Sequence, residues 1–223
     1  MTSSAQFEVD TGIRVVCFDL GGVVVRIHRN WKALFARFAH EDVANRIDQE
    51  LEARITDLFE TYQLGTIGFD QLLSGMGAAL GEGIDLDTIS RAIDSIVIEE
   101  YAGVAGIIEQ LGKSGLSTAC LSNTNERHWK RMVSWPSLKS MKHHVASHMV
   151  GLAKPEHAIY LKLEEVVQAR GPEILFFDDT FENVQAAREL GWISVHVDPT
   201  APTAPQLITG LAANGIVLQG GAC

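Results

Sequence analysis

Three short apolar runs that each stop abruptly at a polar side chain constrain this sequence more than any other feature. Residues 15–18, 119–121 and 174–177 are followed at once by Asp19, Ser122 and Asp178. A short apolar run bounded by a turn is typical of a strand buried on both faces, as in a parallel sheet. Helical patterns lie between the runs, and strands that alternate with helices imply a sheet covered on both sides. The sequence therefore predicts an α/β fold with a doubly wound, Rossmann-like parallel sheet.

The polar residues after these strands are expected to meet in one crevice. Open parallel sheets bind ligands just beyond the carboxyl ends of their strands, which places Asp19, Ser122, Asp178 and the adjoining Asp179 close together. Lys154, in the Gly-Leu-Ala-Lys-Pro segment at residues 151–155, adds a cation from a separate loop. Three carboxylates, a hydroxyl and an ammonium group in one crevice indicate metal-assisted phosphoryl chemistry.

Between the first and second strands the pattern becomes helical. Apolar residues recur at helix spacing within residues 31–38, 55–62 and 69–80, and Asp85 or Asp87 is suited to begin a further helix through residue 96. We therefore predict a small helical cap domain at residues 28–100, without a strand of its own. It is inserted into an α/β hydrolase core that comprises residues 11–27 and 101–223.

The rest of the core alternates helices and strands. Helices are expected at residues 104–113, 157–170 and 184–190, each leading to a strand at 116–121, 174–177 or 192–197. Three prolines after the last strand predict a loop, and the tail beyond it shows no clear chemistry. These prolines are Pro199, Pro202 and Pro205.

Composition excludes several classes of partner. The formal net charge of -10 argues against a general affinity for nucleic acid or for anionic membranes. No apolar stretch approaches the ~18 residues that a membrane span needs, and residues 1–10 lack the basic and then apolar segments of a signal peptide.

Cys17 and Cys120 lie inside expected strands and are interpreted as small apolar core residues. Together with Cys223 they form no disulfide framework. We expect a cytoplasmic protein.

Each candidate site residue has a chemical use. A carboxylate at Asp19 is placed to attack phosphorus and form an aspartyl-phosphate. Gly21 and Gly22 allow the backbone to approach a phosphate closely. Ser122 and Asn123 can donate hydrogen bonds to phosphate oxygens, and Lys154 can neutralise their charge. The adjacent carboxylates of Asp178 and Asp179 repel one another unless a cation is near, and Mg²⁺ prefers oxygen ligands of this kind.

Together these segments resemble the haloacid dehalogenase-like (HAD) hydrolase superfamily, and the resemblance covers most of the chain in the right order. It implies a nucleophilic Asp, a strand ending in Ser or Thr, a Lys often followed by Pro, and an acidic pair with a further polar position after it. It also implies that the helical insertion is a mobile cap and that the metal is held by Asp19, the carbonyl of Gly21 and Asp179, with Asp178 in support. In this sequence the motifs are Asp19, Ser122, Lys154-Pro155, Asp178-Asp179 and Asn183.

One position departs from the superfamily's phosphatases. Most of them carry a second Asp two residues after the nucleophile as general acid and base, and here that position is Gly21. Among phosphatases, the sequence is most similar to the branch of α-D-glucose-1-phosphate phosphatase, which shares the Gly. Arg26, His28 and His128 are weighed as replacements for the acid, although each also fits an ordinary surface or hinge role. His143, His144 and His148 are interpreted as structural rather than as a metal site.

Three functions remain open. The first is a Mg²⁺-dependent phosphatase that acts on a small phosphorylated metabolite, with a sugar phosphate preferred, and it is expected to be a monomer or a weak homodimer. The second is a hydrolase of 2-haloacids, which uses an Asp nucleophile but needs no metal, so the acidic pair fits it poorly. The third is a non-catalytic protein that binds a phosphorylated ligand, with Gly21 as the mark of lost chemistry.

Overall fold

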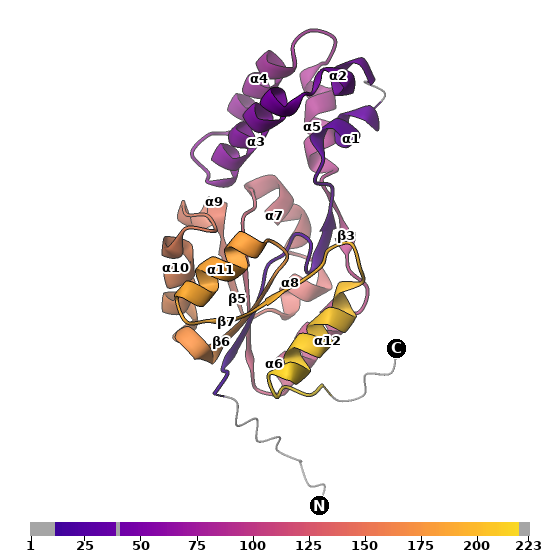
Figure 1. Cartoon of the computed structure of the whole chain (residues 1–223). Helices are drawn as coiled ribbons and strands as arrows, with labels where there is room; N and C mark the ends of the chain where they lie inside the picture. The colour runs from indigo at the N-terminus through magenta and orange to yellow at the C-terminus, as the bar shows by residue number, and fades with distance from the viewer. Residues whose placement is uncertain (1–11, 39–40, 219–223) are drawn as a thin grey trace, which may run out of the picture.

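The computed structural model describes residues 12–38 and 41–218, and its centre is a parallel sheet of five strands in the order β5-β4-β1-β6-β7 (Figure 1). All four strand pairs are parallel. The α/β fold with a doubly wound parallel sheet is therefore confirmed. The strands are β1 Val15–Phe18, β4 Ser117–Ser122, β5 His143–Ala146, β6 Ile174–Asp178 and β7 Ile193–His196.

Helices cover both faces of this sheet because its central strands are apolar on both sides. Along β1, Val15 and Cys17 belong to one hydrophobic cluster, whereas Val16 and Phe18 belong to another. The first cluster includes residues of α10 and α11, and the second includes residues of α6, α7, α8 and α12. The helices of the core are α6 Val104–Lys113, α7 Glu126–Met132, α8 Pro136–Ser140, α9 Ser147–Val150, α10 His157–Val167, α11 Phe181–Glu189 and α12 Thr203–Ala213, with a 3₁₀ turn at Gly171–Glu173.

The segment between β1 and β4 leaves the core through a two-stranded ribbon and forms a helical unit above it (Figure 1). The ribbon pairs β2 (Val25–Ile27) with β3 (Val97–Glu100) in antiparallel fashion. Apolar residues between positions 31 and 96 form a hydrophobic cluster of their own. The helices of this unit are α1 Trp31–Ala36, α2 Glu41–Arg46, α3 Gln49–Gln63, α4 Phe69–Leu80 and α5 Leu86–Asp94.

Strand β3 corrects one expectation. Residues 28–100 were expected to contain no strand, but β3 occupies the last four of them and pairs with β2. Its Val-Ile-Glu-Glu sequence lacks the apolar–polar alternation of a half-buried strand and follows a strong helical pattern. The boundaries at residues 28 and 100 remain a prediction, which the separate apolar cluster supports.

The helix starts follow local capping chemistry. The side chain of Asp48 accepts a hydrogen bond from the Leu51 N–H at the start of α3, and Asp85 accepts one from the Thr88 N–H at the start of α5. Of the two aspartates considered for α5, Asp85 is therefore the N-cap.

The tail differs from expectation as well. Pro205 was expected in a loop, but it lies in the first turn of α12. Backbone N–H groups in the first turn of a helix have no intrahelical acceptor, so a proline, which lacks the N–H, is tolerated there. Strand β5, at the edge of the sheet, was not predicted at all, because its His-His-Val-Ala sequence lacks a long apolar run.

Both cysteines in the described residues are free and buried, and burial raises the pKa of each thiol, that of Cys120 to about 12. This agrees with their interpretation as apolar core residues. Residues 1–11, 39–40 and 219–223, including Cys223, lie outside the described part. Within that part, we find no helix with the length and apolar character to cross a bilayer.

Candidate active site

A buried ion-pair network lies where β1 and β6 end. The Lys154 Nζ donates to Asp19 Oδ1 at 2.7 Å and to Asp178 Oδ2 at 2.6 Å. The side chains of Lys154 and Asp178 are 2% and 0% exposed, and that of Asp19 is 10% exposed. The sequence placed these three residues in one crevice, and the structure brings them into direct contact.

The charges in this network depend on one another. Burial disfavours the ammonium form of Lys154, but the nearby carboxylates of Asp178 and Asp19 outweigh it and raise the Lys154 pKa well above its usual value. Burial raises the pKa of Asp19, with the ammonium of Lys154 opposing this change. Lys154 is therefore held in its cationic form, and its charge favours the ionised, nucleophilic form of Asp19 against the effect of burial.

Asp178 is fully occupied by structural contacts. Besides the bond to Lys154, its two oxygens accept hydrogen bonds from Asn183 Nδ2 at 3.1 Å each, and Oδ1 accepts one from the Thr180 N–H at 2.8 Å. This arrangement fits the expected supporting role of Asp178. Asn183, the further polar position after the acidic pair, orients the carboxylate that binds Lys154.

Asp179 faces a different partner. Its Oδ2 is in direct contact with the guanidinium of Arg29, which also donates to the Gly21 carbonyl at 2.9 Å. Burial raises the pKa of Asp179 to about 7, the charge of Asp19 adds to this, and Arg29 opposes it. Arg29 thus lies against two of the oxygens expected to hold a metal. The sequence analysis missed this residue, since an isolated Arg in a connecting segment carries no pattern.

The oxygen atoms fit a hard divalent cation. Asp19, Asp178 and Asp179 each offer a carboxylate oxygen within 4.8 Å of the others, and no other group of three or more His, Cys, Asp or Glu in residues 12–38 and 41–218 does so. Three carboxylates and a carbonyl are the donors that Mg²⁺ prefers. If bound, Mg²⁺ would be held by Asp19, Asp179 and the Gly21 carbonyl and would neutralise phosphate charge. His143, His144 and His148 form no such group.

The side-chain amide of Asn123 contacts the Lys154 loop. Its oxygen accepts from the Lys154 N–H and its Nδ2 donates to the Lys154 carbonyl, both at 2.9 Å. The amide therefore fixes the Lys154 loop, and the second Nδ2 hydrogen and the backbone N–H are the donors that Asn123 has left for a phosphate oxygen, a role that stays a prediction. Ser122 ends β4 beside it, 2% exposed, and lines the neighbouring pocket.

Close packing and backbone conformation require the second of the two glycines after Leu20. Gly22 has a φ of 90°, and a Cβ there would collide with the side chains of Asp179 and Arg29. At Gly21 a Cβ would lie 2.8 Å from Cδ1 of Ile27, the end of a flexible side chain that can move. Packing alone therefore does not explain the glycine at position 21.

Of the three residues considered as replacement acids, only His28 both lines the pocket and leaves a ring nitrogen without a protein partner. His28 Nε2 contacts Arg37, and burial together with that charge lowers its pKa. Both ring nitrogens of His128 are taken, by Asn125 and by the Ile93 carbonyl. Arg26 points elsewhere, since it pairs with Glu99.

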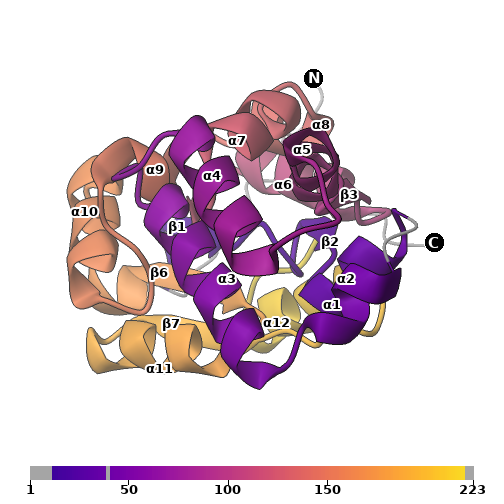
Figure 2. The ribbon, with the colours of Figure 1, turned by 90° about the horizontal axis from the view of Figure 1, so that it is seen from above.

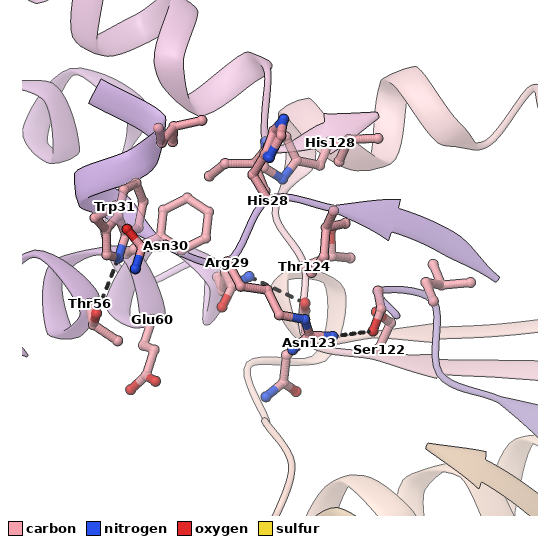
Figure 3. Close-up of a pocket in the computed structure, with 18 of the residues that line it drawn as sticks. His28, Arg29, Asn30, Trp31, Thr56, Glu60, Ser122, Asn123, Thr124 and His128 are labelled. Carbon is pink, nitrogen blue, oxygen red and sulfur yellow. Dashed lines mark hydrogen bonds between the residues drawn. The ribbon is translucent and has the colours of Figure 1, made fainter. Parts of the chain in front are cut away.

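A pocket of about 250 Å³ opens between these strand ends and the helical unit (Figure 3). Viewed from above, α3 and α4 lie over the end of the sheet (Figure 2). The pocket floor includes Gly21, Ser122 and Asn123, and its upper wall comes from α1 and α3. Its volume is slightly below that of pockets for drug-sized ligands, which suits a small metabolite.

Comparison with known proteins identifies the family. The family model for haloacid dehalogenase-like hydrolases matches residues 13–191, so this chain belongs to the haloacid dehalogenase-like hydrolases. It is similar to bifunctional epoxide hydrolase 2 of Mus musculus, with 30% identity over 225 residues. That match covers 89% of this chain but only 39% of the mouse protein. The sesquiterpene phosphatase astK of Aspergillus oryzae is 21% identical, with 88% of this chain and 96% of that protein covered.

A solved structure shares the fold. It is a HAD family enzyme of Bacteroides thetaiotaomicron, with a TM-score of 0.75 and 21% identity over 88% of this chain and 98% of that one. The wild-type form of that enzyme has also been solved as a complex with magnesium and inorganic phosphate, with a TM-score of 0.71. At this identity the likeness shows the fold alone.

Proposed function

We propose that this hydrolase is a Mg²⁺-dependent phosphatase that acts on a small phosphorylated metabolite through an aspartyl-phosphate at Asp19. The observation that carries the proposal is the contact of Lys154 with both Asp19 and Asp178 beside a third carboxylate, Asp179. A cationic lysine and a carboxylate cluster suited to Mg²⁺ are what a phosphoryl group needs around it. The relative named as a phosphatase and the structural neighbour with magnesium and phosphate support the same reaction class.

In the proposed reaction each residue has a defined task. The Asp19 oxygen that does not bind Lys154 attacks phosphorus, and the bond from phosphorus to the alcohol oxygen breaks. The departing oxygen takes a proton, and water then cleaves the aspartyl-phosphate, which releases phosphate and restores Asp19. Lys154, Ser122 and the Asn123 N–H hold the phosphate oxygens throughout. Gly21 supplies no proton, and burial together with the charge of Arg37 lowers the pKa of His28 and leaves its ring mainly unprotonated at neutral pH. The departing oxygen therefore takes its proton from water.

The preference for a sugar phosphate within this class remains a prediction. The alternative of a 2-haloacid hydrolase gains no support from a cluster of three carboxylates, which that metal-free reaction does not need. A non-catalytic binding protein would not need a carboxylate that Lys154 keeps charged and next to the pocket.

The test is phosphate release from a panel of phosphomonoesters with Mg²⁺ and with EDTA, using the wild type and Asp19→Asn. Release that requires Mg²⁺ and disappears in Asp19→Asn is expected, because the amide is no nucleophile. Ser114→Ala, at the end of α6 in the core, serves as a control that should retain activity. Release that survives in Asp19→Asn would contradict the role of Asp19, and halide release in EDTA would favour the haloacid reaction.

A further inference from the structure

One wall of the pocket is a polar strip on helix α3, formed by Thr56, Glu60 and Gln63 and called the α3 strip below. The spacing of these residues places them on one side of the helix, and all three line the pocket together with Ser122 and Asn123. In Figure 3 the labelled Glu60 side chain extends away from the helix rather than packing against it. The strip therefore faces the space that Gly21 and Ser122 also line, which under the proposed function receives the alcohol of a phosphate ester at Asp19.

The one charged group of the α3 strip is a hydrogen-bond acceptor. Gln63 Nε2 donates one hydrogen to the Asn123 carbonyl at 3.2 Å and retains a second hydrogen besides the side-chain oxygen. Thr56 Oγ1 accepts from Trp31 Nε1 at 3.2 Å and can still donate its own hydrogen. The exposed carboxylate of Glu60 forms no hydrogen bond or ion pair within the described residues. It can accept hydrogen bonds from a ligand and cannot donate any at neutral pH.

Part of the pocket lining is apolar. Leu20 follows β1, Ile27 and Val97 lie on the ribbon, Ile96 directly precedes β3, and Met132 ends α7. A ligand in this pocket can therefore place its carbon skeleton against these side chains and its polar edge against Glu60 and Gln63.

We propose that the α3 strip selects phosphomonoesters whose alcohol portion carries hydroxyl or ammonium donors and no second anionic group, with Glu60 as the specificity-determining residue. This inference rests on the proposed phosphatase function. A carboxylate or second phosphate on the ligand would lie against the Glu60 charge, and the other α3 residues that line the pocket are uncharged and do not offset the repulsion. The Arg29 guanidinium, which also lines the pocket, lies against the Gly21 carbonyl and Asp179 rather than on the α3 wall.

Matched pairs of esters test the proposal. Glycerol 3-phosphate and 3-phosphoglycerate share a three-carbon chain, and glucose 6-phosphate and 6-phosphogluconate share a six-carbon chain. In each pair only the second compound adds a carboxylate. We expect wild-type kcat/KM to be about fivefold higher for the ester without a carboxylate. This factor corresponds to the repulsion of one pair of like charges in a water-like medium. The preference should come mainly from KM and shrink as salt is raised.

The variant Glu60→Gln is expected to remove the preference by raising kcat/KM on the carboxylated esters about fivefold relative to their partners. Asp57→Asn is the matched control, since Asp57 is an exposed acid on the same helix that does not line the pocket. It should keep the preference.

An unchanged ratio in Glu60→Gln, or a wild-type preference for the carboxylated esters, would overturn the inference while the phosphatase proposal stands. The generic substrate 4-nitrophenyl phosphate distinguishes failure of the α3 strip inference from failure of the phosphatase proposal. If no protein releases phosphate from it or from any ester, the proposed function fails and this inference fails with it.

Discussion

The strand ends of the core and the cap-side wall of the pocket face the same cavity but are built in opposite ways. In the core, Lys154, Asp19 and Asp178 are buried and each side chain is held by the others. On the cap side, Glu60 is exposed and independent of its neighbours. Chemistry that needs fixed, desolvated charges belongs to the first region. Selectivity, which a single side chain can change, belongs to the second.

The largest effect is expected from Lys154→Met. It leaves Asp19 and Asp178 buried with oxygens within 4.8 Å of one another and no lysine between them. Removing one partner from a buried ion pair typically destabilises a protein by about 3–5 kcal/mol, and phosphate release should be lost as well. Urea denaturation followed by circular dichroism measures the first effect.

Lys162→Met is the control, because Lys162 forms only a surface pair with Glu165. It should change stability by less than about 1 kcal/mol. If Lys154→Met were as stable as this control, the ion pairs of Lys154 with Asp19 and Asp178 would not stabilise the core.

A cavity in the cap core gives the next largest effect. Ile55 is fully buried in the apolar cluster of the helical unit, and Ile55→Ala should cost about 2–5 kcal/mol. Hydrogen exchange should accelerate in α3, α4 and α5 while β1 and β6 stay protected, because the core has a separate cluster. The matched core variant Leu121→Ala should instead accelerate exchange in the sheet.

Equal acceleration of the sheet by Ile55→Ala would show that the two regions unfold as one unit. The predicted boundary between cap and core would then have no energetic meaning.

The smallest effect concerns Arg29, which joins the two regions. Its guanidinium contacts Asp179 and the Gly21 carbonyl, so it competes with a cation for these oxygens. Arg29→Gln is expected to tighten Mg²⁺ binding about tenfold, or ~1.4 kcal/mol, measured by isothermal titration calorimetry at pH 8. Arg26→Gln, which removes a surface cation that pairs with Glu99, should leave the affinity unchanged.

The same titration has a pH signature. With the pKa of Asp179 raised to about 7, a proton must leave this carboxylate before it can ligate a metal below that pH. Affinity should therefore fall as the pH is lowered from 8 to 6. Binding that is weaker in Arg29→Gln, or independent of pH, would show that Arg29 and the metal do not share these oxygens.

The sequence by itself determined four of the five strands of the sheet and most of the candidate site. Buried parallel strands need apolar residues throughout, so a polar residue at the end of such a run is conspicuous, and topology brings strand ends together. Asp19, Ser122, Asp178 and Asp179 were found in this way, and Lys154 was added from a separate loop. Their roles as nucleophile, phosphate ligands and metal ligands remain proposals that the geometry supports.

Only the tertiary structure decided the rest. The engagement of Asn123 with Lys154, the Ile27 side chain beside Gly21 and the contact of Arg29 with Asp179 join segments whose local sequence shows no pattern. Strand β3 likewise depends on its pairing with β2. The apolar periodicity of the sequence predicts which residues of one helix or strand are buried. It does not predict how a helical unit packs over a sheet, and that packing decides which side chains meet in the pocket.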